Sequence, residues 1–599
     1  MLSLRHCSKS ARYKLYPKSH ITLAGCRLLS TSTTEDYDVV IIGGGPAGLA
    51  LAAGLGTNNI TSRLKIALVE ASGLDKVRNW TEAPGQYSNR VSSLTNESVA
   101  FIQSTGAWDY VDTGRVCPLE AMQVTTFNLT KEHRLISSQV WDGISDARIY
   151  FSPSDLARLP TTGTLPKSMA TMTENLNLQR GLLKRLESVP SVKLLDITKV
   201  EEIQNGSGDH NSWPVVNTST GKSLRSRLLI GADGFNSPVR KFAGIGSSGW
   251  AYDTHAVVAT LFHPHREKYA TLAHLEQPNS TAFQRFLTTG PIACLPLSST
   301  ASSLVWSTTP AIATALKSAP PATLAIFINA AFRLPESALQ NLYSVLLTTH
   351  QNETPLSPEA ARAEVQQAEI AHSVPPHDAR ASADIDSLTK GVLPEGSNLL
   401  PPLVIGIQDR TIAGFPLKYS HAETYIGTGQ GARSVLVGDA AHTVHPLAGQ
   451  GLNMGLSDVR ELVTCLGNAI STGSDIGSYT ALLPYMRSRY MPNQSLLLAT
   501  DTLHKLYGTT ASPIVWARST GLEIINELST IKGALMGVAG ASPANLSTSW
   551  WNAAASGVEG LAGAGDVLRA VGGSLKDAIT KTGSSIVQGG VNALKNSRH

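Results

Sequence analysis

The chain has 599 residues, enough for about four domains at roughly 150 residues each. Hydrophobic residues make up 42% of the sequence and charged residues 16%, a balance that excludes intrinsic disorder along the whole length. No apolar run reaches the roughly 18 residues of a membrane-spanning helix. The five cysteines are too few and too scattered to indicate a disulfide framework or a zinc site.

The net charge of +4 originates in the N-terminus. Residues 1–34 contain six basic residues and no acidic one, whereas the remainder holds 43 basic and 45 acidic residues, which removes most of the reason to expect nucleic acid binding. An Arg- and Ser-rich, acid-free start is typical of a mitochondrial targeting peptide. We therefore predict that residues 1–34 are such a peptide, with processing near residues 29–34. A basic tail without a targeting function is the alternative.

A β-α-β unit follows the leader. Residues 37–42 (YDVVII) predict a short, buried parallel strand, because they are apolar and rich in β-branched side chains. A glycine-rich turn over 43–48, a helix over 49–55 and a second strand over 64–70 come next. This succession is typical of the start of a nucleotide-binding domain.

Later strands suggest that this domain is interrupted. Segments 226–230 and 434–437 predict strands that enter turns with an aspartate, and between them 292–297 and 303–307 suit an antiparallel sheet. The predicted fold class is α/β, with a Rossmann-like domain interleaved with a mostly antiparallel β-sheet substrate domain, and a helical C-terminal region.

The predicted domain limits are 35–115, 166–250 and 418–480 for the nucleotide-binding domain; 116–165 and 251–417 for the substrate domain, including a Pro/Ala-rich insertion at 318–400; 481–540 for C-terminal helices; and 541–599 for a low-complexity tail. Within the insertion, 360–370 suits a helix and 374–399 a surface excursion. The C-terminal helical pattern covers 482–531.

The first turn carries a dinucleotide-binding pattern in the right context, after a strand and before a helix. Gly43 permits the tight turn, Gly45 lets the backbone approach a pyrophosphate, and Gly48 lets helix and sheet pack closely. Glu70, at the end of the second strand, is placed to accept hydrogen bonds from a ribose. A glycine-rich turn with an incidental glutamate is the alternative.

Two later segments narrow the choice of dinucleotide. Residues 228–240 (LLIGADGFNSPVR) form a strand, a tight turn and a helix start, and residues 434–453 (SVLVGDAAHTVHPLAGQGLN) form a strand, an acidic turn and a glycine-rich helix start. Together with the first turn, they resemble the three fingerprints of the flavin-dependent aromatic hydroxylases, the group of p-hydroxybenzoate hydroxylase. The resemblance implies that FAD is the cofactor.

Further segments resemble the ubiquinone-biosynthesis monooxygenases of this group: 87–94 (YSNRVSSL), 284–293 (QRFLTTGPIA), 414–417 (GFPL) and 439–453. The resemblance covers roughly residues 36–540, and the leader with the proline-rich excursion is similar to the mitochondrial branch. The tail at 541–599 departs from the family pattern. Gly414 stands where the family usually has alanine.

The resemblance implies FAD contacts for individual residues. Arg90 would contact the flavin and pyrophosphate, Asn175 would touch FAD, Asp233 would support the pyrophosphate region, and Asp439 would hydrogen-bond the ribityl chain. The residues that would present backbone N–H groups to the isoalloxazine ring are Gly449, Gly451, Leu452 and Asn453. Capping of a helix is the alternative role of Asp233 and Asp439, and a cap and a cofactor contact can coexist.

Three other side chains have open roles. His442 and His445 have the spacing of a metal pair, but only Asp439 is nearby and FAD explains it better, so we predict no metal. Arg285 either steers a substrate carboxylate or faces solvent.

The resemblance implies hydroxylation of the aromatic ring of a polyprenylated 4-hydroxybenzoate at C5, and a second ring hydroxylation later in ubiquinone synthesis, through a flavin C4a-hydroperoxide. No catalytic base is identified. The implied partners are O₂, a ferredoxin and its reductase as electron donors, and other enzymes of the pathway in a membrane-associated complex. Direct reduction by NADPH stays open. The implied location is the matrix side of the mitochondrial inner membrane, as a peripheral protein.

Two other functions remain open on the same residues. One is an epoxidase or reductase that acts on an isoprenoid chain. The other is a subunit that holds flavin only as a structural part of a biosynthetic complex.

Overall fold

The computed structural model describes residues 34–119, 138–142, 148–151, 168–206, 213–264, 279–372, 374, 401–445 and 449–516, with only the backbone described for 138–142 and 148–151. The predicted leader up to residue 33, the predicted tail at 541–599 and nearly all of the predicted excursion at 374–399 therefore lie outside the described residues.

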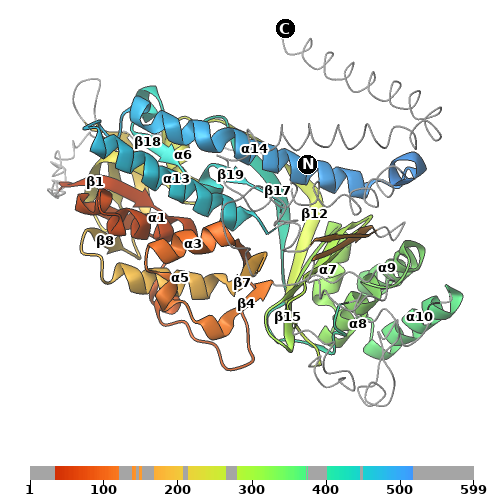
Figure 1. Ribbon diagram of the computed structural model, residues 1–599. Coiled ribbons are helices and arrows are strands. Elements are labelled where there is room, and N and C mark those ends of the chain that lie inside the picture. Colours follow the sequence, from red (N-terminus) through yellow and green to blue (C-terminus); the bar gives the residue numbers. More distant parts are fainter. Residues whose placement is uncertain are drawn as a thin grey trace, which may run out of the picture.

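A seven-stranded sheet forms the centre of one half of the molecule (Figure 1). Its strands are β1 (Thr34–Ile42), β2 (Ile66–Val69), β8 (Val192–Leu195), β9 (Val200–Asn205), β10 (Pro214–Thr218), β11 (Ser223–Gly231) and β18 (Ser434–Leu436). Five of them are parallel neighbours in the order β8-β2-β1-β11-β18, and β10 and β9 extend the sheet antiparallel from β11. The predicted β-α-β unit and the two later strands are confirmed.

Helices cover this sheet, and α1 (Pro46–Thr57) is the most deeply buried of them. Figure 1 shows it near α3 (Asn96–Ser104), α5 (Asn175–Leu186) and α13 (Gly451–Ser471). Eight successive residues of α1, from Gly48 to Leu55, are buried, and five of them are glycine or alanine. Small side chains allow helix and sheet to approach closely, as the glycine pattern predicted. A small sheet of β3 (Val91–Thr95), β7 (Ala170–Glu174) and β4 (Val116–Leu119) lies beside α3 and α5.

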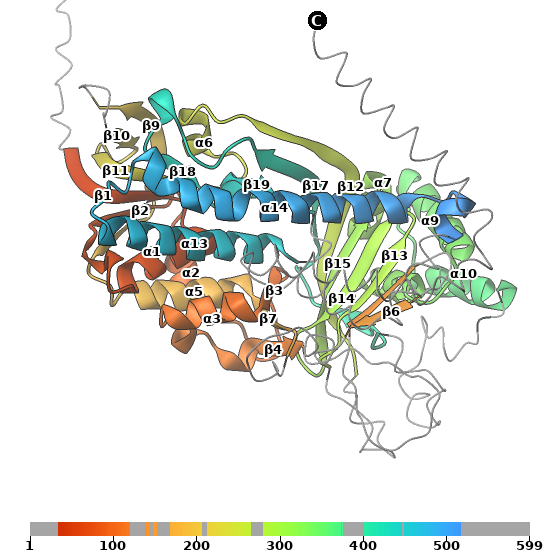
Figure 2. The same cartoon turned by 45° about the horizontal axis from the view of Figure 1, so that its top comes forward.

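A nine-stranded sheet forms the other half (Figure 2). Its strands are β5 (Ser138–Asp142), β6 (Arg148–Phe151), β12 (Ser247–Phe262), β13 (Phe283–Leu287), β14 (Gly290–Pro296), β15 (Ala301–Thr308), β16 (Gly406–Ile407), β17 (Ala413–Ala422) and β19 (His442–Thr443). All pairs are antiparallel except β13 with β5. This confirms the mostly antiparallel sheet, with β14 and β15 at the predicted positions.

Four helices cover one face of the nine-stranded sheet: α7 (Pro310–Ser318), α8 (Pro321–Ala331), α9 (Glu336–Gln351) and α10 (Pro358–Ala371). Each has a proline at or next to its first residue, where the missing N–H costs no hydrogen bond. Fully buried Trp306, Phe327 and Tyr343 belong to one core between these helices and the sheet. The first part of the Pro/Ala-rich stretch is therefore a packed helical layer, and the predicted helix at 360–370 lies within α10.

Helix α14 (Tyr479–Gly508) joins the two halves. It packs along α13 and then reaches β13, β14 and β17 (Figure 2). Pro484 and Pro492 lie inside it. The predicted helical stretch at 482–531 is thus helical to Gly508 and again over 512–516, and the part after residue 516 lies beyond the described residues. Among the described helices, none has the length and hydropathy that a bilayer crossing requires.

Candidate functional site

The three fingerprint turns meet at one edge of the seven-stranded sheet. In the parallel register, Ile42 of β1 pairs with Gly231 of β11, and Gly231 pairs with Leu436 of β18. The turns that follow these strands carry Gly43, Asp233 and Asp439. The carboxyl ends of parallel strands face the same edge of a sheet. Turns that are nearly 400 residues apart in sequence therefore lie together and form one candidate binding region.

The three glycines of the first turn differ in the space around them. Gly43 has φ of +112°, and a Cβ there would lie 2.3 Å from the Ala232 carbonyl oxygen. A Cβ at Gly48 would lie 1.9 Å from the Gly43 oxygen, whereas a Cβ at Gly45 would meet no atom within 4 Å. Gly43 and Gly48 are therefore needed by the fold itself, and Gly45 borders open space.

Helix α1 begins at this open space without a side-chain cap, and Gly45 is its N-cap residue. Its first-turn N–H groups have no acceptor within the helix, and the helix dipole favours an anion beside them. The start of α1 therefore fits a pyrophosphate.

Glu70 has a contact that the pattern did not predict. Its Oε2 accepts a 2.6 Å hydrogen bond from the Gly44 N–H, and its Oε1 accepts a 2.8 Å bond from the Ser72 N–H. Each carboxylate oxygen can accept further hydrogen bonds, so the predicted ribose contact is compatible with this arrangement. Glu70 thus braces the glycine turn as well as offering oxygen atoms to a hydroxyl.

Asp233 contacts a helix with one carboxylate oxygen, and its other oxygen has no partner among the described residues. Its Oδ2 accepts a 3.2 Å hydrogen bond from the N–H of Val239 in α6 (Pro238–Phe242), while Ser237 caps that helix. Its Oδ1 is buried and has no hydrogen-bond partner among the described residues. Burial raises the pKa of the carboxyl, and its hydrogen bonds and Arg240 oppose that rise. One oxygen therefore supports the helix and the other is available for a ligand group.

Asp439 is the more accessible of the two aspartates. It lies in the short 3-10 turn Gly438–Ala440, whose N-cap residue is Val437, so Asp439 caps no helix. The residue is exposed to solvent, yet the surrounding protein raises the pKa of its carboxyl, against the influence of His442. No hydrogen bond from the described residues reaches this carboxylate, which leaves its oxygens free to accept hydrogen bonds from hydroxyl groups.

The start of α13 offers backbone donors. Gly449 has φ of +58°. Gln450 is the N-cap residue, and its side chain makes no capping hydrogen bond to the helix backbone; its Oε1 accepts a 3.3 Å hydrogen bond from Asn453 Nδ2. Met454 N–H is the first to bond within the helix, to the Gln450 oxygen. The N–H groups of Gly451, Leu452 and Asn453 precede it and have no acceptor within the helix.

The side chain of Asn453 is structural. It is 3% exposed, its Oδ1 accepts hydrogen bonds from Thr95 N–H (3.0 Å) and Ser98 Oγ (2.9 Å), and its Nδ2 donates to the Ser93 oxygen at 2.7 Å. The amide thus fastens α13 to β3, so any ligand contact falls to its backbone, as predicted.

Arg90 and Asn175 lie next to each other at the end of the small sheet. Asn175 N–H donates to the Arg90 oxygen at 3.0 Å, and Asn175 Oδ1 accepts a 2.6 Å hydrogen bond from Ser92 Oγ. The Arg90 side chain is exposed. Since Asn453 binds Ser93 of the same strand, β3 brings Arg90, Asn175 and the start of α13 together.

An ion pair that sequence reasoning missed supports this corner. The Arg115 guanidinium lies 2.7 Å from the buried carboxylate of Glu174, which also accepts the N–H of Ser88. Arg115 further contacts the rings of Trp80 and Tyr87. The sequence could have drawn attention only to Glu174, because it stands next to Asn175. Nothing in the sequence connects it with Arg115, which is 59 residues away.

The two histidines have protein partners. His442 Nε2 lies 2.6 Å from the Asp458 carboxylate. The ring of His445 packs edge-on against Tyr252, at a centroid distance of 5.1 Å, and 4.8 Å from the ring of His504. In the part of the chain that the structure describes, no group of three or more His, Cys, Asp or Glu side chains could hold a metal ion.

Arg285 does not face solvent. It is 4% exposed, and its Nη1 donates 2.9 Å hydrogen bonds to the carbonyl oxygens of Ala331 and Leu334 at the end of α8. The solvent-facing alternative is therefore wrong, because the guanidinium fastens the helical layer to β13.

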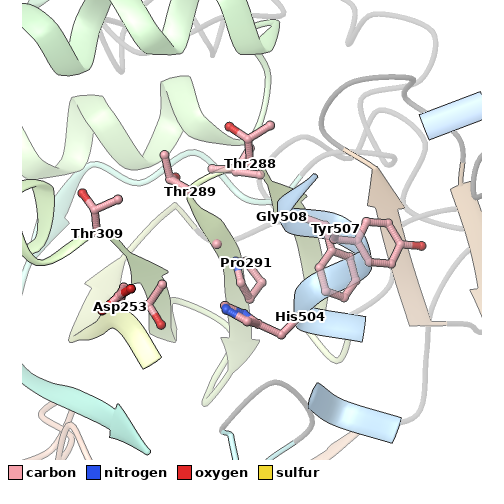
Figure 3. Close-up of a pocket in the computed structure, with 12 residues that line it drawn as sticks. Asp253, Thr288, Thr289, Pro291, Thr309, His504, Tyr507 and Gly508 are labelled. Carbon is pink, nitrogen blue, oxygen red and sulfur yellow. The ribbon is translucent and has the colours of Figure 1, made fainter. Parts of the chain in front are cut away.

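A cavity of about 190 Å³ lies between the end of α14 and the nine-stranded sheet (Figure 3). It is lined by Asp253, Thr254, Phe286, Leu287, Thr288, Thr289, Gly290, Pro291, Thr309, His504, Tyr507 and Gly508. Tyr507 stacks on Phe286 at 4.0 Å, so the helix end rests on the sheet face opposite α7–α10. None of the residues predicted to contact FAD lines this cavity.

Comparison with known proteins agrees with this geometry. The family described as FAD binding domain matches residues 36–323 and 417–485. The ubiquinone biosynthesis monooxygenase COQ6, mitochondrial, of Saccharomyces cerevisiae is 36% identical over 529 residues, 87% of this chain and 97% of the relative. The protein of the same name from Schizosaccharomyces pombe is 35% identical, over 84% of this chain and 91% of the relative. That from Homo sapiens is 33% identical, over 90% of this chain and 100% of the relative.

Solved structures share the fold. The crystal structure of p-nitrophenol 4-monooxygenase PnpA from Pseudomonas putida matches 84% of this chain and 99% of its own, with a TM-score of 0.52 and 16% sequence identity. Pseudomonas aeruginosa PqsL in complex with 2-aminobenzoylacetate matches 82% and 100%, with a TM-score of 0.50 and 19% identity. These similarities confirm the predicted fold class.

Proposed function

Because the chain belongs to the family of mitochondrial ubiquinone biosynthesis monooxygenases, we propose that it hydroxylates the aromatic ring of a polyprenylated 4-hydroxybenzoate. It is an FAD-dependent monooxygenase, and its relatives confirm a part in ubiquinone biosynthesis. The proposed position is C5, with a second ring hydroxylation later in the pathway. The observation that carries the proposal is the meeting of three FAD-binding turns at one sheet edge in a chain that matches these relatives almost throughout.

The residues fit FAD in two groups. At the sheet edge, α1 offers uncapped N–H groups to the pyrophosphate beside Gly45, Glu70 accepts from the ribose, and Asp233 Oδ1 and Asp439 accept from hydroxyls and polar groups of the cofactor. Around β3, Arg90 and Asn175 would contact the flavin half of the cofactor. Gly43 and Gly48 shape the turn.

The start of α13 provides the chemistry that this chain adds to the cofactor. The N–H groups of Gly451, Leu452 and Asn453, after the turn at Gly449, would stabilise negative charge on the ring of a reduced flavin, and the helix dipole would act in the same direction. When bound, FAD would supply the redox chemistry by which one oxygen atom of O₂ enters the aromatic ring and the other leaves as water. The protein orients the partners and excludes water.

Product analysis tests the reaction. Purified protein with FAD, reductant, O₂ and a short-chain prenylated 4-hydroxybenzoate should yield the C5-hydroxylated product with one atom of ¹⁸O from ¹⁸O₂. An epoxidised side chain, or a reduced product without O₂ consumption, would show the rival enzymatic function. Rescue of a deletion strain by an Asp439→Ala protein that carries no FAD would show a purely structural role.

The electron donor is proposed to be a ferredoxin with its reductase. The support is the resemblance to the mitochondrial branch of the family, which is associated with these two carriers. The sequence has no second strand–GxGxxG–helix pattern after residue 48, but this does not distinguish the donors, because hydroxylases of this class that NADPH reduces directly also lack one. The test is anaerobic reduction of the bound flavin, followed as the loss of the absorbance of oxidised flavin at about 450 nm. Bleaching by NADPH only when both electron carriers are present supports the proposal, and equally fast bleaching by NADPH alone contradicts it.

We further propose that the protein works on the matrix side of the mitochondrial inner membrane as a peripheral protein, among other enzymes of the pathway. Its relatives are named as mitochondrial. A polyprenyl chain partitions into lipid at about 0.8 kcal/mol per buried CH₂, so the enzyme meets its substrate at a membrane surface. Release by carbonate extraction of isolated mitochondria, together with protection from protease until the inner membrane is opened, is the expected result. Retention in the carbonate pellet contradicts it.

A further inference from the structure

A fully buried carboxylate lies behind the turn that carries Asp439. Asp458, in the second turn of α13, is 0% exposed. Its Oδ2 accepts a 2.6 Å hydrogen bond from His442 Nε2 and a 3.1 Å bond from the Gly438 N–H. Gly438 directly precedes Asp439, and His442 follows it by three residues. The two contacts therefore hold the turn on both sides of Asp439.

The other oxygen of the same carboxylate is held by α14. Asp458 Oδ1 accepts hydrogen bonds from Arg489 Nε at 2.8 Å and from Asn493 Nδ2 at 2.9 Å, and Arg489 also donates to Asn493 Oδ1 at 2.6 Å. Four donors thus use the acceptor capacity of this one buried carboxylate.

The charge state of this network follows from its partners. Burial alone would raise the pKa of Asp458, but His442 and Arg489 lower it below its ordinary value. Burial alone would lower the pKa of Arg489, and Asp458 raises it. The aspartate and the arginine are therefore a charged pair at neutral pH, and removal of either leaves a buried charge without its partner.

Two of these partners lie outside the matched FAD-binding family region. That match ends at residue 485, before Arg489 and Asn493. The Tyr485 hydroxyl, one turn earlier, donates a 2.8 Å hydrogen bond to the carbonyl oxygen of Leu436, the last residue of β18 before the acidic turn. Helix α14 thus contacts β18 directly and reaches the acidic turn through Asp458.

We propose that Asp458 is a positioning residue of the FAD site. Together with Arg489 and Asn493, it fixes the turn from Gly438 to His442 so that the Asp439 carboxylate is already oriented when the ribityl chain arrives. The inference rests on the proposed assignment of Asp439 to that chain. A turn held in advance loses less conformational entropy on binding, so its release lowers affinity without any lost ligand contact.

A double-mutant cycle separates positioning from simple stabilisation. Asp439→Asn, Asp458→Asn and the double variant are prepared as full-length apoproteins. The dissociation constant of FAD is measured by quenching of flavin fluorescence, with the thermal midpoint of each apoprotein and the visible circular dichroism of its bound flavin. Each single change is expected to weaken FAD binding about tenfold, and the double variant to weaken it by about the same factor. Asp458→Asn should also change the flavin dichroism.

Two further variants keep the test decisive. Asn493→Ala removes one contact of Asp458 but keeps the ion pair with Arg489, so it serves if Asp458→Asn does not fold; about threefold weaker binding, non-additive with Asp439→Asn, is expected. Asp475→Asn is the matched control, because Asp475 pairs with Arg433 at 2.5 Å and touches no part of the turn. It should lower the thermal midpoint and leave the FAD dissociation constant within twofold.

The unfavourable results are distinct. If Asp439→Asn weakens binding but the effects of Asp439 and Asp458 multiply, or if the Asp458 and Asn493 variants change only the thermal midpoint, the positioning role is overturned while the Asp439 assignment stands. If Asp439→Asn leaves FAD binding unchanged, the assignment of Asp439 is wrong and the inference fails with it.

Discussion

Arg240 and Ala440 connect two of the three cofactor turns. The Arg240 Nη1 donates a 2.7 Å hydrogen bond to the Ala440 carbonyl oxygen, and its Nη2 donates a 2.5 Å bond to the Phe235 oxygen. Phe235 belongs to the turn of Asp233, and Ala440 directly follows Asp439. One guanidinium therefore fixes the spacing between the two aspartates, a role that the sequence motif ending in Arg240 did not indicate.

Replacement of Arg240 should weaken FAD binding although the side chain need not touch the cofactor. Hydrogen bonds from a charged group contribute about 1.5–3 kcal/mol each, and loss of one such contribution from the bound geometry corresponds to at least about a tenfold rise in the dissociation constant. Fluorescence titration of the Arg240→Ala apoprotein with FAD measures the dissociation constant. The exposed neighbour Lys241→Ala is the control, and equal affinities in the two variants would contradict the role of Arg240.

Two glycines in the same turn should respond differently to valine. A Cβ at Gly45 meets no protein atom within 4 Å, so Gly45→Val should fold, with a thermal midpoint of the apoprotein near that of the parent, and lose FAD. At Gly48 a Cβ would lie 1.9 Å from a backbone oxygen, so Gly48→Val should disrupt the fold itself. Flavin content and thermal unfolding distinguish the two.

Gly563→Val, in the tail outside the described residues, is the control for flavin occupancy. Full occupancy in Gly45→Val, equal to that control, would show that no pyrophosphate lies against this turn. Normal folding of Gly48→Val would show that the helix and turn are not packed as described.

Arg285 should matter for stability and not for substrate binding. Arg285→Met keeps much of the buried volume but leaves the oxygens of Ala331 and Leu334 without their donor, and unsatisfied buried groups cost about 1–3 kcal/mol each. We expect a free energy of unfolding lower by about 2–4 kcal/mol and an unchanged KM for the aromatic substrate. A large rise in KM with unchanged stability would restore the substrate-steering role.

The strands and turns of the FAD half could be predicted from sequence because each carries its own local signal. A buried parallel strand is a short β-branched run, and the turn after it needs glycine or a short acid, so residues 37–48 identify themselves. The same reasoning placed Asp233 and Asp439, since each follows such a strand directly.

The contacts that hold the turns together have no such signal. Asp458 and Arg489 are 31 residues apart on two helices, and Tyr87 exchanges two hydrogen bonds with Gln408 across 321 residues, at 2.8 and 2.9 Å. No periodicity connects residues across such separations, because the meeting is made by the packing of whole elements. Helices α8 and α9 were missed for a related reason, although the helix at 360–370 was predicted: prolines that start helices look the same in sequence as prolines that interrupt them.

Acid should destabilise the protein well above the range in which its carboxylates titrate. Burial lowers the pKa of His421 to about 4, and the neighbouring His442 lowers it further while Asp458 partly offsets the shift. Burial lowers the pKa of His445 to about 3, and there His504 lowers it further while Asp501 partly offsets the shift. Unfolded histidine has a pKa near 6.5, so between about pH 6.5 and 4 the unfolded chain binds more protons than the folded one. The free energy of unfolding therefore falls as the pH is lowered through this window, by up to about 1.4 kcal/mol per pH unit for each histidine.

His421→Gln isolates one of these contributions. Urea unfolding of the variant at pH 5, 6 and 7 should give a pH slope smaller by about one proton, and His421→Gln with His445→Gln a slope smaller by about two. Asp233 and Asp439 act in the opposite sense, because the surrounding protein raises the pKa of each carboxyl and the folded state therefore holds their protons more firmly. Their contribution is common to parent and variants and cancels in the comparison. An unchanged slope in His421→Gln would show that this imidazole gains its proton over the same pH range in the folded and the unfolded protein. Its buried place, with Nε2 3.0 Å from the Tyr425 hydroxyl, opposes that result, because burial disfavours the charged ring.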